Sequence, residues 1–142
     1  MTFAIEFWHN PTCGTSRNAL QLVRDAGYVP DVVLYLETPP SAARIAEVLA
    51  AMGEGPRHLI RTKGTPYAGM GLDDPALTDD ALVAAMAATP ILINRPVVIT
   101  PKGMKLCRPS EVVLDLLERL PPGPWAKEDG ELIIDAGGRR VK

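Results

Sequence analysis

Residues 3–27 read FAIEFWHNPTCGTSRNALQLVRDAG, and this stretch decides the fold. Its first residues alternate between large apolar side chains and others, which predicts a strand. The run His-Asn-Pro-Thr at 9–12 then interrupts that pattern. From 15 to 26 apolar residues recur at helical spacing, which predicts a helix with one buried face that ends near Gly27. Cys13 therefore lies where a strand gives way to a helix.

Further elements follow along the chain. The continuous apolar run at 32–36 is typical of a buried strand, and the segment 54–77 has no clear periodicity. Later segments combine turn signals with apolar faces. In chain order we expect a helix from 39–41 to 53, a helix from Thr78, strands at 91–93, 97–100 and 104–106, a helix from 109 to 120, and a tail with one apolar patch at 132–134.

The order of these elements predicts the fold class. A β-α-β half, a helical stretch and then β-β-α is the order of a thioredoxin-like fold. We therefore expect an α/β protein with a thioredoxin-like (glutaredoxin-like) mixed sheet flanked by helices, and a helical insertion before the β-hairpin. The length of 142 residues suits a single domain over 1–142, with a core at about 1–120 and a C-terminal tail at 121–142.

Composition excludes several classes of function. The net charge is −2 without a basic block, so nucleic acid is not an expected partner. The apolar runs are too short to cross a membrane, and the first eight residues, interrupted by Glu6, do not fit a signal peptide. We therefore expect a cytoplasmic protein. Two cysteines and two histidines without metal-ligand spacing indicate no bound metal.

Cys13 is the candidate nucleophile. The thiolate is the reactive form of cysteine, and unpaired N–H groups at a helix N-terminus lower the pKa of a thiol. His9, four residues earlier, could assist as a cation. The alternative is a small buried core cysteine. A loop that contains proline and glycine favours the functional interpretation.

The neighbours of Cys13 limit its chemistry. A thioredoxin-type dithiol needs a second cysteine at position 16, which is Ser16. A tyrosine-phosphatase loop needs arginine at position 19, which is Ala19. The amides and hydroxyls of residues 14–17 instead form an anion cradle at a helix start, with Gly14 and Thr15 at its centre.

Three arginines beside element ends are candidate oxyanion ligands. Arg61 follows a short apolar patch, Arg95 stands before Pro96, and Arg108 precedes the last helix. A guanidinium group binds oxyanions through paired donors and keeps its charge. The alternative for each is an ordinary solvated arginine on the surface.

The motifs resemble those of a known family. Residues 9–17, HNPTCGTSR, look like the signature of the glutaredoxin-coupled arsenate reductases, the ArsC family. The resemblance runs nearly end to end. It also includes LYLE at 34–37, PILINRP at 90–96, LCRPSEVV at 106–113 and KEDG at 127–130.

The resemblance implies a reaction and roles for the candidates. Cys13 would attack arsenate, glutathione would attack the adduct, glutaredoxin would resolve the mixed disulfide, and arsenite would leave in a detoxification reaction without a bound cofactor. The implied site residues are Arg61, Arg95 and Arg108 on the oxyanion, His9 and Ser16 as assisting groups, and Pro96 as a cis proline that faces the cysteine loop.

Two other functions stay open. A glutathione-dependent thiol reductase of the same fold needs Cys13 but not the three arginines. A regulator that binds RNA polymerase and senses redox state needs a paired-cysteine motif, which Ser16 removes. Cys107 could resolve a disulfide at Cys13, but we expect it to be a buried structural thiol.

Overall fold

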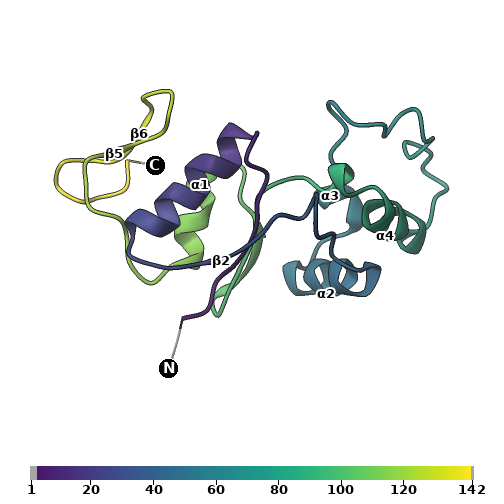
Figure 1. Cartoon of the computed structure of the whole chain (residues 1–142), viewed down its shortest axis with the longest axis horizontal. Helices are drawn as coiled ribbons and strands as arrows, with labels where there is room; N and C mark the ends of the chain where they lie inside the picture. The colour runs from purple at the N-terminus through teal and green to yellow at the C-terminus, as the bar shows by residue number, and fades with distance from the viewer. Residues whose placement is uncertain (1–2, 142) are drawn as a thin grey trace. The chain divides into compact units, whose positions relative to one another are not determined.

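A four-stranded mixed sheet with the strand order β2-β1-β3-β4 organises the computed structural model, which describes residues 3–141 (Figure 1). The central strand β1 (Glu6–Trp8) runs parallel to β2 (Asp31–Val33) and antiparallel to β3 (Val97–Thr100). The edge strand β4 (Gly103–Leu106) pairs antiparallel with β3. This topology confirms the predicted α/β class and the hairpin after the helical stretch.

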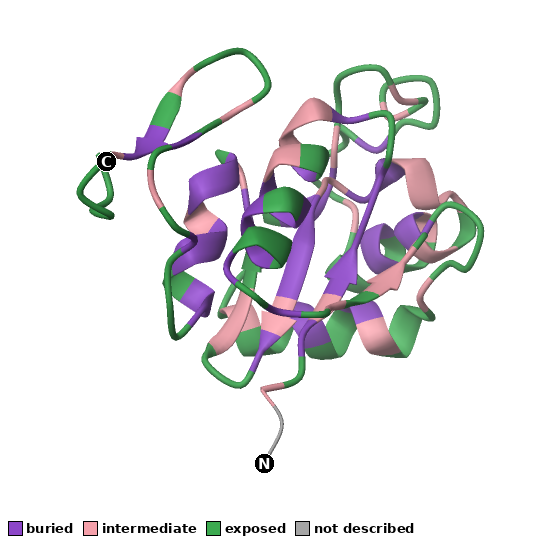
Figure 2. Cartoon of the chain, turned by 60° about the vertical axis from the view of Figure 1, so that its left-hand side comes forward, coloured by how far each residue is buried: buried purple, intermediate pink, exposed green. Residues whose placement is uncertain are grey.

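The helix α1 (Gly14–Asp25) forms as the apolar spacing predicts. Its inner residues Ala19, Leu22 and Val23 are fully buried in the core. Figure 2 colours the chain by burial and shows buried positions in the strands and on the helices. Gly27 follows the helix with a φ of 93°, a left-handed value that glycine adopts without a steric penalty. At 12 residues α1 is the longest helix among residues 3–141, and none of the helices there is long and apolar enough to cross a membrane.

The chain divides into two compact units. The first comprises the residues up to Val33 and those from Arg95 onward, and it contains the sheet. The second, Leu34–Asn94, contains α2 (Ala42–Met52), α3 (Pro56–Leu59), α4 (Asp79–Ala88) and the 3-10 helix η1 (Pro90–Leu92). The predicted helical insertion is therefore confirmed, whereas the single domain over 1–142 stays a prediction.

Side-chain caps start the two longer helices of the second unit. The Ser41 hydroxyl accepts a hydrogen bond from the Arg44 amide, and the Thr78 hydroxyl accepts one from the Ala81 amide. Gly53 ends α2 in the left-handed conformation, with φ 71°. The caps explain why both helices begin where the turn residues predicted.

Three predicted elements differ from the structure. Of the strand expected at 91–93, the first two residues belong to the 3-10 helix η1, and Ile93 forms only an isolated antiparallel bridge with Ile60. An apolar run alone does not separate a strand from another buried segment. The strand expected at 32–36 ends at Val33. The last helix is also 3-10, and this element, η2, covers only Ser110–Leu116.

The C-terminal tail contributes to the core of the first unit. It forms a hairpin of β5 (Trp125–Ala126) and β6 (Leu132–Ile134). Ile133 and Ile134 are fully buried, and the Trp125 Nε1 donates to the Asp25 carboxylate at 2.8 Å. The tail is thereby fixed to α1, the helix that follows Cys13.

Candidate active site

Cys13 is the N-cap residue of α1, with extended backbone angles of φ −97° and ψ 119°. Its amide donates to the Asn10 carbonyl at 3.1 Å, and its carbonyl accepts from the Arg17 amide at 2.9 Å. The residue is 8% exposed. The fold therefore holds the thiol at the positive end of the helix dipole, as predicted.

Buried polar contacts fix the loop before Cys13. The Asn10 side-chain oxygen accepts from the Thr12 amide at 3.0 Å and from the Thr12 hydroxyl at 2.8 Å. The Ser16 Oγ accepts from the Asn10 amide at 3.1 Å and lies 2.7 Å from the His9 Nδ1. Ser16 is fully buried, so its hydroxyl holds the loop against the first turn of α1.

The surroundings of His9 favour its neutral form. Burial lowers the pKa of its imidazole, and the positive charges of Arg24 and Arg17 lower it further. Both influences act against a cationic His9, and its assisting role stays a prediction. The His9 Nδ1 and the Ser16 hydroxyl share a hydrogen bond, so the imidazole ring and Ser16 orient each other.

Two of the three candidate arginines converge on the sulfur. The Arg108 Nη1 lies 3.7 Å from the Cys13 Sγ and donates to the Arg95 carbonyl at 2.9 Å. The Arg95 side chain also hydrogen-bonds the Cys13 thiolate. The Arg95–Pro96 peptide bond is cis, and the Pro96 carbonyl accepts from the Cys107 amide at 2.8 Å.

These contacts activate the thiol. Burial, the largest single influence, raises the pKa of Cys13, but hydrogen bonds from Arg95, the Ser16 amide and Arg108, with the charge of Arg95, outweigh it. The net effect lowers the pKa of Cys13 to about 7. A thiol with this pKa is about half ionised at neutral pH and is a good nucleophile.

Arg61 belongs to the second unit, Leu34–Asn94. A backbone bridge between Ile60 and Ile93 holds its segment. Its guanidinium donates to the Lys63 carbonyl at 3.1 Å and to the Asn94 side-chain oxygen at 3.3 Å. A role of Arg61 on the oxyanion stays a prediction.

Cys107 has the surroundings of a structural thiol. It is fully buried, and its Sγ lies 3.7 Å from the Lys105 carbonyl. Burial raises the pKa of this thiol far above that of Cys13. Within residues 3–141, no group of three or more His, Cys, Asp or Glu side chains is placed to hold a metal ion.

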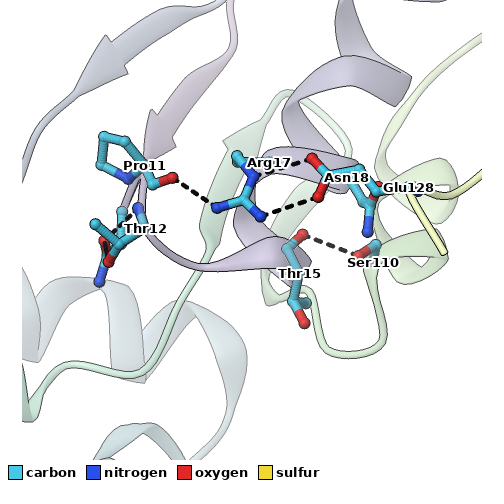
Figure 3. A network of polar contacts seen from close by, with 8 residues as sticks. Pro11, Thr12, Thr15, Arg17, Asn18, Ser110 and Glu128 are labelled. Carbon is cyan, nitrogen blue, oxygen red and sulfur yellow. Dashed lines mark hydrogen bonds and ion pairs between the residues drawn. The ribbon is translucent and has the colours of Figure 1, made fainter.

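A second polar network beside the cysteine loop was missed by the sequence analysis (Figure 3). The Arg17 Nη1 donates to the Pro11 carbonyl at 2.9 Å, while its Nε and Nη2 donate to the two carboxylate oxygens of Glu128, each at 2.9 Å. The Ser110 hydroxyl donates to the Thr15 carbonyl at 2.8 Å. Both Arg17 and Glu128 lie in motifs that were noticed, but 111 residues separate them, and no periodicity connects them.

Comparison with known proteins decides the family. The model of the ArsC family matches residues 8–116, most of the chain, including Cys13 and the three candidate arginines. The chain belongs to the ArsC family. The resemblance inferred from the motifs is therefore confirmed.

Other members of the ArsC family are similar along nearly their whole length. An arsenate reductase of Rhizobium meliloti (strain 1021) is 54% identical over 137 residues, 96% of this chain and 98% of the relative. An arsenate reductase of Escherichia coli is 49% identical over 138 residues, 97% of this chain and 98% of the relative. The solved structure of an arsenate reductase from Vibrio cholerae has a TM-score of 0.79 and 38% identity, over 82% of this chain and all of that one. The thioredoxin-like fold is confirmed by this likeness.

Proposed function

We propose that this ArsC family member reduces arsenate to arsenite, with the Cys13 thiolate as nucleophile and with electrons from glutathione and glutaredoxin. The observation that carries the proposal is a thiol with a pKa of about 7 that two guanidinium groups hydrogen-bond. Relatives about 50% identical over nearly the full chain, named arsenate reductases, support the choice of substrate.

The groups around the sulfur suit a tetrahedral oxyanion. Arg95 and Arg108 supply fixed positive charge beside Cys13. The amides of Gly14 and Thr15, in the first turn of α1, supply further donors at the positive end of the helix. Paired guanidinium donors bind arsenate and stabilise the charge that builds up on its oxygens during attack.

The reaction balances with two thiols. The Cys13 sulfur bonds to arsenic(V), and one arsenate oxygen leaves as water after protonation. The sulfur of glutathione then bonds to the Cys13 sulfur, and the sulfur–arsenic electron pair stays on arsenic. Arsenic is reduced by two electrons to arsenite, and the two thiols are oxidised to a mixed disulfide. Glutaredoxin thiols reduce that disulfide and restore Cys13.

The second thiol comes from outside the chain. The sequence has two cysteines, and the other one, Cys107, is fully buried. Position 16 holds Ser16, so no neighbouring thiol can form a disulfide with Cys13. Glutathione and glutaredoxin are the thiol reductants of a reducing compartment, so we place the protein in the cytoplasm.

Arsenate-dependent oxidation of NADPH tests the proposal. The assay combines the purified protein with glutathione, glutaredoxin and glutathione reductase. We expect turnover that requires arsenate, glutathione and glutaredoxin and that Cys13→Ser abolishes. Turnover of a glutathione mixed disulfide without any response to arsenate would instead assign the protein to the thiol reductases.

A variant of Arg95 distinguishes an arsenate reductase from a thiol reductase. Arg95→Lys keeps the charge of the side chain but removes the paired donors. In an arsenate reductase it should lower arsenate turnover strongly. In a thiol reductase it should slow the reduction of a mixed disulfide only by as much as the pKa of Cys13 rises, and far less than it slows arsenate reduction.

A further inference from the structure

We propose that the C-terminal hairpin β5–β6 is a positioning element of the active site: Glu128 fixes Arg17, and Arg17 fixes the loop that leads into Cys13. The inference rests on Cys13 as the reactive thiol of the proposed function. The hydrogen bonds of the Arg17 side chain go to the loop and to Glu128, and its charge also interacts with Cys13. Glu128 is therefore the residue whose effect on the thiol passes through the loop.

Arg17 connects the two sides of Cys13. Its backbone amide donates to the Cys13 carbonyl at 2.9 Å, and its Nη1 donates to the Pro11 carbonyl at 2.9 Å. One residue therefore holds the backbone both at the thiol and two positions before it. Figure 3 shows the guanidinium between the Pro11 carbonyl and the Glu128 carboxylate.

Glu128 is held in place independently of Arg17. Its backbone amide donates to the Asn18 side-chain oxygen at 3.0 Å. The preceding Lys127 forms an ion pair at 2.9 Å with Glu111, and these two side chains are only 11% and 9% exposed. Trp125 donates to Asp25 at the start of the same hairpin. The hairpin thus presents the carboxylate from a fixed backbone.

The Arg17–Glu128 pair is poorly placed to stabilise the fold as a whole. The two side chains are 43% and 52% exposed, and solvent and salt screen such pairs. Asn18 and Glu128 also line two cavities, of about 510 Å³ and 300 Å³, so water reaches this contact from two sides. Bidentate geometry nevertheless fixes the orientation of a guanidinium, which is what holding the Pro11 carbonyl requires.

The direction in which the pKa of Cys13 changes when Glu128 is removed shows whether Glu128 positions the loop or acts only through its charge. Removal of a nearby carboxylate lowers the pKa of a thiol by electrostatics alone. A loosened loop instead weakens the hydrogen bonds that hold the Cys13 thiolate, which raises its pKa. Our inference predicts the second result for Glu128→Ala.

The test is the pH dependence of Cys13 alkylation by iodoacetamide in the full chain, with Cys13→Ser to subtract any labelling of Cys107. In Glu128→Ala we expect the pKa of Cys13 to rise by about half a unit or more, so that alkylation below that pKa slows about threefold. Arg17→Met should raise the pKa as well, but it also removes a positive charge that interacts with Cys13, so the sign in Glu128→Ala decides the test. The control Glu131→Ala removes the same side chain from the same hairpin, at a site that pairs with Lys127, and should leave the pKa unchanged. An unchanged or lower pKa in Glu128→Ala would overturn the inference.

Two further measurements complete the test: alkylation of the double variant of Arg17 and Glu128, and alkylation at high salt concentration. In Arg17→Met the addition of Glu128→Ala should have no further effect on alkylation, because Glu128 acts through Arg17; additive effects would contradict this route. High salt should slow alkylation of the wild type and leave Arg17→Met nearly unchanged. Alkylation of Cys13 needs no arsenate, so it tests the positioning role separately from the proposed function. A raised pKa of Cys13 in Glu128→Ala, together with no arsenate reduction by the wild type, would refute the proposed function and leave the positioning role intact.

Discussion

The Arg108 Nη1 lies 3.7 Å from the Cys13 Sγ and 2.9 Å from the carbonyl oxygen of Arg95. One guanidinium nitrogen thereby connects the thiol to the backbone of the second arginine, although 95 residues separate Cys13 from Arg108 in the chain. The contact to Arg95 fixes the direction of the guanidinium. The contact to the sulfur stabilises the thiolate.

Arg108→Ala should therefore impair both the thiol and the binding of arsenate. We expect the pKa of Cys13 to rise, because a hydrogen bond to the thiolate is lost, and kcat/KM for arsenate to fall about a hundredfold or more. The coupled NADPH assay and alkylation against pH measure the two effects. Arg108→Lys, which keeps the charge without the paired donors, should recover part of the pKa shift but little of the turnover. Wild-type turnover in either variant would refute the role of Arg108.

Ionisation of Cys13 should make the stability of the protein depend on pH. The pKa of Cys13 is about 7 in the folded chain, below the value of 9.0 for an unperturbed thiol. Between these values the unfolded chain binds a proton that the folded chain has lost, so the free energy of unfolding rises with pH. The gain is complete above the unfolded pKa and is lost as pH falls through 7.

The measurement is urea denaturation of the wild type and of Cys13→Ser at several pH values. The difference in unfolding free energy between the two should grow as pH rises from 7 towards 9. A difference that does not vary with pH would mean that the folded protein does not favour the thiolate.

Ser16→Ala should destabilise the loop before the cysteine. The variant leaves the Asn10 amide and the His9 Nδ1 without their buried partner. A buried polar group without a hydrogen bond costs about 1–3 kcal/mol. We expect a loss of unfolding free energy of that order and slower alkylation of Cys13. Ser16→Thr, which keeps the hydroxyl, serves as the control for lost hydrogen bonding; equal stability of Ser16→Ala and wild type would contradict the prediction.

Asn94→Ala should act on arsenate through Arg61. The Asn94 side chain accepts from the Arg61 Nη1 at 3.3 Å, and the Asn94 amide donates to the Leu59 carbonyl at 2.8 Å. Only the first contact is lost in the variant, so Arg61 becomes less well oriented. If Arg61 binds arsenate, KM for arsenate should rise several-fold, about 3–10 times, while alkylation of Cys13 stays unchanged.

A double variant checks that route. In Arg61→Ala the further change Asn94→Ala should have no effect on KM, since the side chain that Asn94 orients is already absent. An additional rise in KM would show that Asn94 acts on its own.

Cys107→Ala should retain most of the activity. The thiol is fully buried, and burial raises its pKa, so we expect it neither to attack arsenate nor to resolve a disulfide. We expect a loss of about 1 kcal/mol in unfolding free energy from the smaller side chain. Arsenate turnover that collapses while circular dichroism shows a folded protein would mean that Cys107 takes part in the reaction.

Much of the catalytic half of the molecule could be predicted from local signals. Strict alternation in β1 and helical spacing in α1 each identify one element, and Cys13 at their junction follows from both. The run at 91–93 carried no such signal, since burial on all sides looks the same in a strand and in the 3-10 turn that begins at Pro90. Local periodicity therefore predicted elements with a clear repeat better than short apolar runs without one.

Contacts between segments distant in sequence were predicted only where the expected chemistry of the site required particular side chains to meet. Arg95 and Arg108 were expected at Cys13 because an oxyanion needs guanidinium groups. The bond between Arg17 and Glu128 has no such reason in the sequence, and the short strand β5 is too brief to show a pattern. The lowered pKa of His9 depends on burial and on Arg24, neither of which its position in the motif reveals.

The unit that carries Cys13 is discontinuous in sequence, because its two halves lie on either side of Leu34–Asn94. During synthesis from the N-terminus, β1 and α1 leave the ribosome long before β3 exists to pair with β1. The segment Leu34–Asn94 is also synthesised before β3. The nucleophile therefore meets its arginines only late in the life of the nascent chain, so the thiol is not activated for oxyanion chemistry until the polypeptide is almost finished.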